Sequence, residues 1–171
     1  LGRRAFLVRR RGTGETFVAL RLWKRPMPCQ DDRRISARLE ALRDLQEPAV
    51  CRPGDAFDET HAVALVYELC GESVPDRVVR KSRLSEVRAR EYFKPLIQGL
   101  AATHAAGLVH GGLRGEHWRL PADRRGDEEE GAACAAKVLG CGLTDLLLPD
   151  ALERLDNEAL QHFAPEWMLR D

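Results

Sequence analysis

The fold is decided by residues 104–120, His-Ala-Ala-Gly-Leu-Val-His-Gly-Gly-Leu-Arg-Gly-Glu-His-Trp-Arg-Leu. The stretch opens as the end of a helix, and Gly107 stops it because glycine readily adopts the left-handed conformation that ends helices. A short apolar run at 108–109 follows. Beyond it lies a glycine-rich loop that carries His110, Glu116 and His117. These polar side chains are the first candidates for a functional site.

The composition is that of a folded protein with no overall charge. The chain has 171 residues, of which 44% are hydrophobic and 32% charged, so it suits one or two small globular domains. Its 27 basic and 27 acidic residues cancel, and no overall field draws it to nucleic acid. No apolar run approaches the roughly 20 residues of a membrane span, and no signal-peptide pattern opens the chain. We therefore expect a cytoplasmic protein without a membrane span.

The cysteines favour buried, reduced thiols. A structural zinc site needs paired ligands in tight turns, and the chain has no C-x-x-C pair. We therefore expect no metal site. The cysteines are Cys29, Cys51, Cys70, Cys134 and Cys141.

The first part of the chain reads as strands with one helix. Apolar runs at 5–10 and 17–23 surround a glycine-containing turn and predict a hairpin. A helix is predicted from Asp31 until Pro48. The uniformly apolar run 62–69 predicts a buried strand, which a polar turn at 70–73 ends. The apolar positions of the helix are Ile35, Leu39, Leu42 and Leu45.

The second part reads as mainly helical. A helix is predicted to begin at Ser85, a good cap residue, with a kink or a late start caused by Pro95. Residues 121–131 predict an exposed loop, and 137–139 a short strand that glycines break. A further apolar run, 143–148, ends at Pro149. The side chains that this helix is predicted to bury are Ala89, Phe93, Leu96, Leu100 and either Thr103 or His104.

Residues 110–117 resemble the catalytic loop of protein kinases, H-R-D-L-K-P-E-N. Three positions are kept and Arg114 replaces the lysine, whereas Gly112 and His117 stand where the family has aspartate and asparagine. The kept residues are His110, Leu113 and Glu116.

Further motifs follow in the family's order. Residues 18–21, Val-Ala-Leu-Arg, resemble V-A-I-K, and 67–71, Tyr-Glu-Leu-Cys-Gly, resemble the hinge with Tyr67 as gatekeeper. Residues 140–142, Gly-Cys-Gly, stand at D-F-G, and 164–166 spell A-P-E. The strongest stretches of the chain resemble calcium/calmodulin-dependent and plant-type calcium-dependent serine/threonine kinases.

The resemblance implies an α+β fold with two lobes. Residues 1–70 correspond to the strand-rich N-lobe with one helix, without the start of the glycine loop. Residues 71–171 correspond to part of the mainly helical C-lobe. The family's later helices are absent after A-P-E, so the sequence is interpreted as an excerpt or truncated product, or as a chain that needs a partner to cover its apolar surface.

The resemblance also implies an inactive site. Arg21 stands at the lysine position, Arg38 at its glutamate partner, and Gly112 at the proton acceptor. His117 and Gly140 stand at the two metal ligands, and neither offers the oxygen that magnesium prefers. We therefore expect no intact catalytic residue and no bound magnesium.

The two arginines at the ion-pair positions carry like charges. Facing inward without partners they would be costly, so one is expected to turn to solvent or to find a carboxylate. The candidate carboxylates are Glu40, Asp55 and Asp58.

ATP could still reach the hinge, because its contacts there are backbone groups of Glu68 to Cys70. Ala19 keeps a small ceiling beside the gatekeeper Tyr67, whereas Arg119 places a charge at the floor. We expect ATP binding to be weak or absent, and independent of magnesium. His110 and Glu166 are assigned structural roles, and Cys141 is interpreted as a small buried hydrophobic residue.

The sequence thus predicts a pseudokinase, a protein-binding or allosteric module with a protein partner and no catalysis. An atypical serine/threonine kinase with slow phosphoryl transfer is the alternative. A degenerate fragment without a folded function is a third reading. No cofactor is expected.

Overall fold

The computed structural model describes residues 4–23, 32–60, 62–122 and 136–142. Within these ranges the chain forms strands and helices in an α+β arrangement, as predicted. The division into domains 1–70 and 71–171 stays a prediction. Several predicted features lie outside the described residues: Cys29, Cys134, the loop up to residue 131, the run 143–148 and the A-P-E segment with Glu166.

The first sheet has four antiparallel strands in the order β1-β2-β4-β3. Strands β1 (Arg4–Arg9) and β2 (Thr16–Trp23) form the predicted hairpin, whose turn contains Gly12 and Gly14 with positive φ. Strand β4 (Ala62–Glu68) is the predicted buried strand. Strand β3 (Asp55–Asp58) was not predicted, because it is short, has aspartate at both ends and is largely exposed.

Helix α1 (Asp32–Asp44) confirms the first predicted helix but ends before Pro48. The guanidinium of Arg52 donates hydrogen bonds to the carbonyls of Arg43 (3.1 Å) and Leu45 (2.8 Å). A cation at this end satisfies carbonyls that have no partner inside the helix. A contact from outside the helix therefore fixes where it stops.

A second sheet follows directly, in the order β5-β6-β7. Strand β7 (Lys137–Val138) lies where a short strand was predicted, and β6 (Trp118–Pro121) directly follows the catalytic-loop segment. The predicted polar turn at 70–73 is wrong, because these residues form β5 (Cys70–Ser73). A Cβ placed on Gly71 would lie 2.6 Å from the Pro121 carbonyl oxygen, so glycine permits this close strand pairing.

Helix α2 (Val74–Lys81) was not predicted, although its start is encoded locally. The hydroxyl of Ser73 accepts a hydrogen bond from the Asp76 N–H (3.1 Å), and the Asp76 carboxylate accepts one from the Ser73 N–H (3.4 Å). This reciprocal pair is a capping box, and Pro75 occupies a position at which proline is favourable.

Helix α3 (Glu86–Ala105) begins where it was predicted, since the Ser85 hydroxyl accepts a hydrogen bond from the Arg88 N–H (3.2 Å). It continues through Pro95. The predicted buried face is partly wrong, because Phe93 is 52% exposed. Leu96 and Thr103 are buried as predicted, and Ala89 and Leu100 are half-buried. The fully buried positions are Arg88, Tyr92, Leu96, Gly99 and Thr103.

Gly99 explains why the buried face of α3 is rotated from the predicted one. A Cβ at Gly99 would lie 3.0 Å from the Ala49 carbonyl oxygen and 3.1 Å from a Val138 methyl. The absence of a side chain lets the helix backbone approach β7 closely, and this contact turns the Gly99 stripe inward. Phe93 stays at the rim, where its ring packs edge-on against Trp118 at a centroid distance of 4.5 Å.

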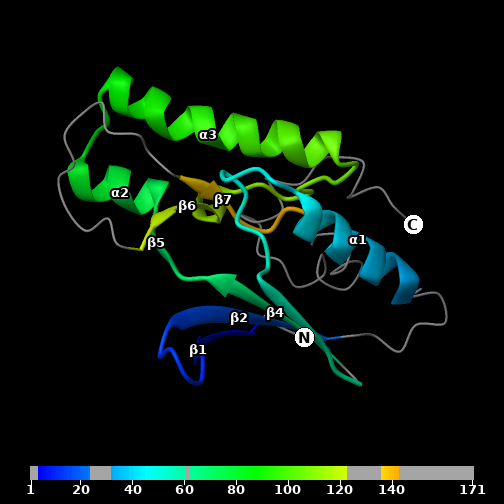
Figure 1. Ribbon diagram of the computed structural model, residues 1–171. Coiled ribbons are helices and arrows are strands. Elements are labelled where there is room, and N and C mark those ends of the chain that lie inside the picture. Colours follow the sequence, from blue (N-terminus) through cyan, green and yellow to red (C-terminus); the bar gives the residue numbers. More distant parts are fainter. Residues whose placement is uncertain (1–3, 24–31, 61, 123–135, 143–171) are drawn as a thin grey trace.

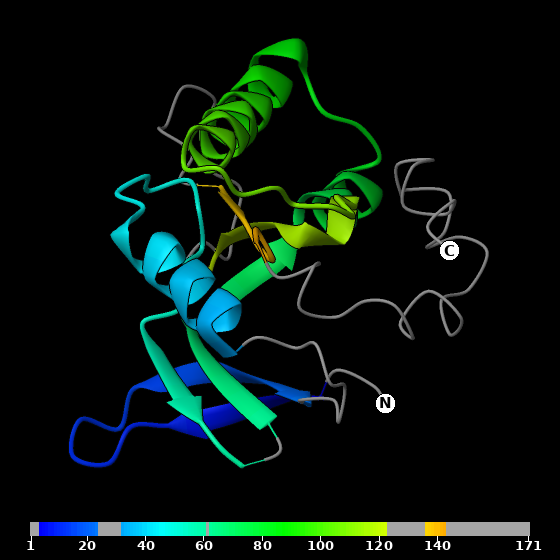
Figure 2. The same ribbon diagram turned by 90° about the vertical axis from the view of Figure 1, so that its right-hand side faces the viewer.

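The four-stranded sheet lies at one end of the molecule and α2 and α3 at the other, with β5, β6 and β7 between them (Figures 1 and 2). One hydrophobic cluster connects these layers, and Leu65 of β4 and Val138 of β7 are fully buried in it. Among the described residues, no helix is long and apolar enough to cross a membrane.

Candidate functional site

The catalytic-loop segment is held to the segment before Gly140 by His110. This side chain is 4% exposed, and its Nε2 lies 2.7 Å from the Leu139 carbonyl oxygen. A carbonyl only accepts, so Nε2 carries the proton and donates. The backbones also meet, since the Gly142 N–H donates to the Val109 carbonyl (3.0 Å). His110 thus has the geometry of a structural tie, and its role stays a prediction.

His117 lies beside His110, with ring centroids 4.9 Å apart. It ends a single 3-10 turn, Gly115–His117, and its Nδ1 accepts a hydrogen bond from the Arg114 N–H (3.2 Å). Its carbonyl accepts one from the Leu139 N–H (2.7 Å). One ring nitrogen is therefore already used by the loop's own backbone.

The two glycines of this centre carry no carboxylate. Gly112 is buried, and Gly140 has φ of +85°, with its missing Cβ 3.6 Å from His110 Nε2. The nearby Glu116 carboxylate is half-exposed and pairs with Arg114 at 3.3 Å, and the same oxygen lies 4.0 Å from His117 Nε2. Among the described residues, no group of three or more His, Cys, Asp or Glu side chains could hold a metal. These donors do not fit a magnesium ion.

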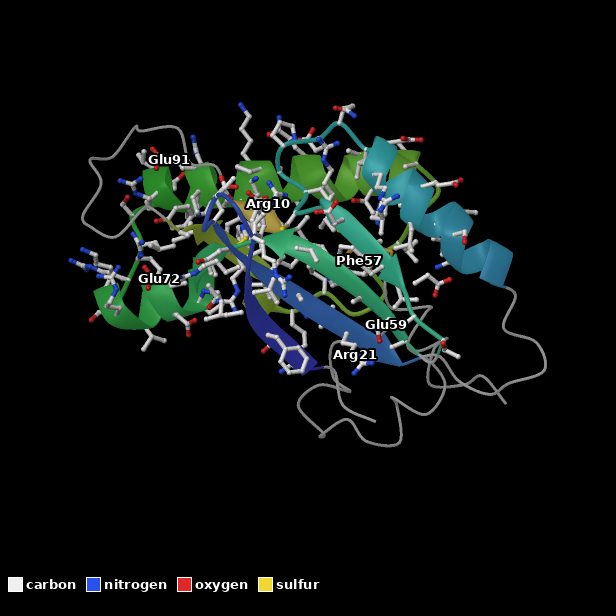
Figure 3. All side chains as sticks on the ribbon, turned by 60° about the horizontal axis from the view of Figure 1, so that its bottom comes forward. Arg10, Arg21, Phe57, Glu59, Glu72 and Glu91 are labelled. Carbon is white, nitrogen blue, oxygen red and sulfur yellow. The ribbon has the colours of Figure 1, made fainter. Side chains whose placement is uncertain are left out.

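Arg21, at the lysine position, pairs with Glu59 near the end of the first sheet. Its Nε donates to Glu59 Oε2 at 3.1 Å, and a second guanidinium nitrogen contacts the same oxygen. The two side chains lie together in Figure 3, at the strand ends. Glu59 is not among the carboxylates suggested by the sequence, because it follows a strand that the sequence did not reveal. Arg38 is half-buried on α1.

The hinge is tied to the second sheet by two cations. Lys137 Nζ of β7 lies 2.5 Å from Glu68 Oε1, and Arg119 Nη1 of β6 donates to the Gly71 carbonyl at 3.2 Å. We call these contacts the hinge ties. Arg119 and Lys137 are direct neighbours in the β6–β7 register. The charge predicted at the floor is therefore held against the hinge backbone.

Other predicted pocket residues surround this region. Tyr67 is buried in the core cluster, and Ala19 is half-buried opposite Val66 on β4. Cys141 is buried, and this burial raises the pKa of its thiol, which matches its interpretation as an inert residue. Whether these positions contact a nucleotide stays a prediction.

The structure brings the predicted residues together in two groups. His110, His117 and Gly140 meet around Leu139, whereas Glu68, Cys70 and Arg119 meet at the hinge. Sequence reasoning missed Lys137 and Glu59. No local signal pointed to Lys137, because 69 residues separate it from Glu68.

The protein kinase domain family matches residues 3–116. The chain is 30% identical over 137 residues to maternal embryonic leucine zipper kinase of Danio rerio, a match covering 80% of this chain and 20% of that protein. It is 32% identical over 116 residues to calcium-dependent protein kinase 12 of Arabidopsis thaliana, covering 66% of this chain and 24% of that protein.

A third relative is matched along most of the chain. Calcium/calmodulin-dependent protein kinase type II of Caenorhabditis elegans is 28% identical over 169 residues, which cover 96% of this chain and 22% of that protein. The chain thus spans about a fifth to a quarter of the length of these curated relatives. The family match covers the hairpin, the hinge and residues 110–116 of the catalytic-loop segment, and the chain belongs to the protein kinase domain family.

Proposed function

We propose that this kinase domain is a pseudokinase, which acts as a protein-binding or allosteric module and does not transfer phosphate. The observation that carries the proposal is the pair of glycines at the centre of the site. Phosphoryl transfer needs a proton acceptor and metal-bound oxygens, and Gly112 and Gly140 supply neither. Glu116 is turned toward Arg114 and does not compensate.

The hinge ties support weak or absent ATP binding. Arg119 is half-buried and its guanidinium is already engaged by the Gly71 carbonyl, so a purine lying on this floor would meet a charge. The nearby Lys137 neutralises Glu68 of the hinge. An apolar floor would favour the binding of a flat, neutral base. Here the base would have to remove water from the Arg119 guanidinium, which costs binding free energy.

A protein partner fits the exposed apolar side chains of α3. Val87 is 51% and Ile97 60% exposed, in addition to Phe93. Exposed aromatic and aliphatic side chains that gather on one helix are typical of protein interaction surfaces. The neutral overall charge gives no comparable reason to propose nucleic acid.

Thermal unfolding of the full chain tests the nucleotide part of this proposal. The unfolding midpoint is measured for the chain alone, with ATP, and with ATP plus magnesium. The same three measurements are made on Arg119→Leu. We expect no change in the wild-type midpoint, because a ligand that does not bind cannot stabilise the folded state. A midpoint raised only when magnesium is present would overturn the interpretation of Gly112, His117 and Gly140. Arg83→Leu, an exposed position, controls for the loss of an arginine.

The names of the three relatives favour an alternative, an atypical serine/threonine kinase with weak transfer. Incorporation of labelled phosphate from ATP into a generic basic protein decides between the two. We expect none from the wild type. Measurable transfer that disappears in Arg119→Glu would establish the alternative.

Restored variants sharpen this result. Gly112→Asp with Gly140→Asp returns both carboxylates, and Gly112→Asn with Gly140→Asn has nearly the same shape without the charge. Both residue types tolerate the positive φ at position 140 better than other side chains. Transfer gained only by the aspartate pair would show that the rest of the pocket is sound. If neither pair gains transfer, the replacements at Arg21, Arg38 and Arg119 also prevent phosphoryl transfer.

A further inference from the structure

Two cysteines from different parts of the chain meet beneath the hinge. The sulfur atoms of Cys51 and Cys70 lie 4.0 Å apart. Cys51 follows α1 and is 2% exposed, whereas Cys70 opens β5 and is half-buried. Both are free thiols in this structure. Cys70 is thus the more exposed residue of the pair.

The backbones that carry the two thiols are fixed on the same sheet. The Cys51 N–H donates to the Val138 carbonyl of β7 at 2.9 Å, and Val50 forms a parallel bridge with Val138. Cys70 is paired with Pro121 of β6. The proximity of the sulfurs therefore results from two anchored segments, not from flexible loop ends.

The surroundings of the two thiols make them unequal. Hydrogen bonding with Cys51 lowers the pKa of Cys70, and the charges of Lys137 and Arg119 act in the same direction, while burial and the charge of Glu68 oppose them. The hydrogen bond with Cys70, followed by burial, raises the pKa of Cys51. The thiolate is the reactive form of cysteine, so Cys70 reacts first and Cys51 is positioned to resolve it.

We propose that Cys51 and Cys70 form a redox modification site that hydrogen peroxide closes to an intrachain disulfide. In the first step the Cys70 thiolate attacks one peroxide oxygen, the O–O bond breaks, and hydroxide leaves as Cys70 becomes a sulfenic acid. In the second step the Cys51 sulfur attacks the Cys70 sulfur. The S–S bond forms, the S–O bond breaks, and the departing hydroxide takes the Cys51 proton to give water.

Closure requires only a short approach. A disulfide bond is about 2 Å long, so the sulfurs must move together by about 2 Å. The bond would join the segment after α1 to the first residue of β5, enclosing β3 and β4 in one covalent ring. Because Glu68 to Cys70 form the hinge, the modification would restrain the hinge itself. This inference does not depend on whether the domain transfers phosphate.

Peptide mapping of the full chain after peroxide treatment tests the proposal. Remaining thiols are alkylated before digestion, and we expect a peptide that links Cys51 to Cys70 and disappears after reduction. Cys141→Ser should keep this linked peptide, since that buried thiol is not part of the pair. Cys70→Ser should lose it and leave Cys51 free to be alkylated after unfolding. Cys51→Ala should stop at the Cys70 sulfenic acid, which dimedone traps.

The kinetics of closure provide a second test. Resolution needs Cys51 to lose its proton, and its raised pKa makes this step faster as the pH rises. The thermal midpoint of the oxidised chain should be higher than that of the reduced chain, and equal to it in Cys70→Ser. The proposal is overturned if a chain that unfolds cooperatively yields stable Cys70 oxidation without the link. It is equally overturned if Cys70 is linked mainly to another cysteine.

Discussion

The hinge and the catalytic-loop centre of this domain differ in the contacts that hold them. At the hinge, each charged side chain has a defined contact: Lys137 with Glu68, and Arg119 with the Gly71 carbonyl. At the centre, His110 contacts the Leu139 carbonyl, and glycine stands at positions 112 and 140. The difference teaches that side-chain pairs hold the hinge, whereas backbone hydrogen bonds and one buried histidine hold the catalytic-loop segment.

Leu65→Ala should break both regions together. Leu65 is fully buried at the centre of β4, so its truncation leaves a cavity in the cluster that connects the sheets. We expect the free energy of unfolding to fall by about 2–5 kcal/mol in urea denaturation. Phe57→Ala on β3 is the control, because Phe57 is 57% exposed and its loss should cost far less. Equal effects of the two changes would contradict the position assigned to this core.

His110→Ala should separate the centre from the hinge. The change removes the hydrogen bond to the Leu139 carbonyl and leaves that buried segment without its donor. We expect a loss of about 1–3 kcal/mol. Hydrogen exchange should show faster opening around 137–142 than around 62–68. His104→Ala, at an exposed position of α3, should change neither quantity. Unchanged exchange in His110→Ala would remove the structural role proposed for this histidine.

Glu72→Gln should sharpen the comparison through pH. Hydrogen bonds from Arg80 and Arg77 hold the pKa of Glu72 below its ordinary value. The ionised Glu72 carboxylate therefore stabilises the folded chain above about pH 4.3, the pKa of a glutamate in the unfolded chain. This contribution to the free energy of unfolding is lost as the pH falls through the lower pKa of Glu72 in the folded chain.

In Glu72→Gln we expect a loss of about 1 kcal/mol at neutral pH and a flatter acid dependence. Unfolding curves between neutral and acid pH measure both. Glu86→Gln, whose side chain is exposed and pairs with Arg90, serves as the control. An unchanged slope in Glu72→Gln would show that this carboxylate does not contribute to the acid transition.

Arg21→Ala should have the smallest effect. The pair with Glu59 is more than a third exposed on both sides, so its removal should cost less than about 1 kcal/mol. Equilibrium unfolding with Glu59→Ala and the double variant measures the coupling of the pair directly. If Arg21→Ala lowered the free energy of unfolding by much more than this, Arg21 would stabilise the fold as strongly as His110 is expected to.

Part of this site could be predicted from single residues, and part could not. Once the motifs are recognised, the sequence identifies the replaced positions, which are Gly112, Gly140 and Arg21. Their contacts could not be predicted, because Glu59 follows a short, largely exposed strand, and Lys137 meets Glu68 across 69 residues. The buried face of α3 was also ambiguous, since neighbouring stripes of a helix satisfy the same spacing.

By itself the sequence determined the features that arise from neighbouring residues. These are the hairpin around Gly12, the buried strand at 62–68, the start of α3 at Ser85 and the loss of carboxylates in the family's motifs. The tertiary structure alone decided the rotation of α3 on Gly99, the hinge ties and the meeting of Cys51 with Cys70. The physical reason is that spacing and capping act within a few residues, whereas side-chain partners depend on how distant segments pack.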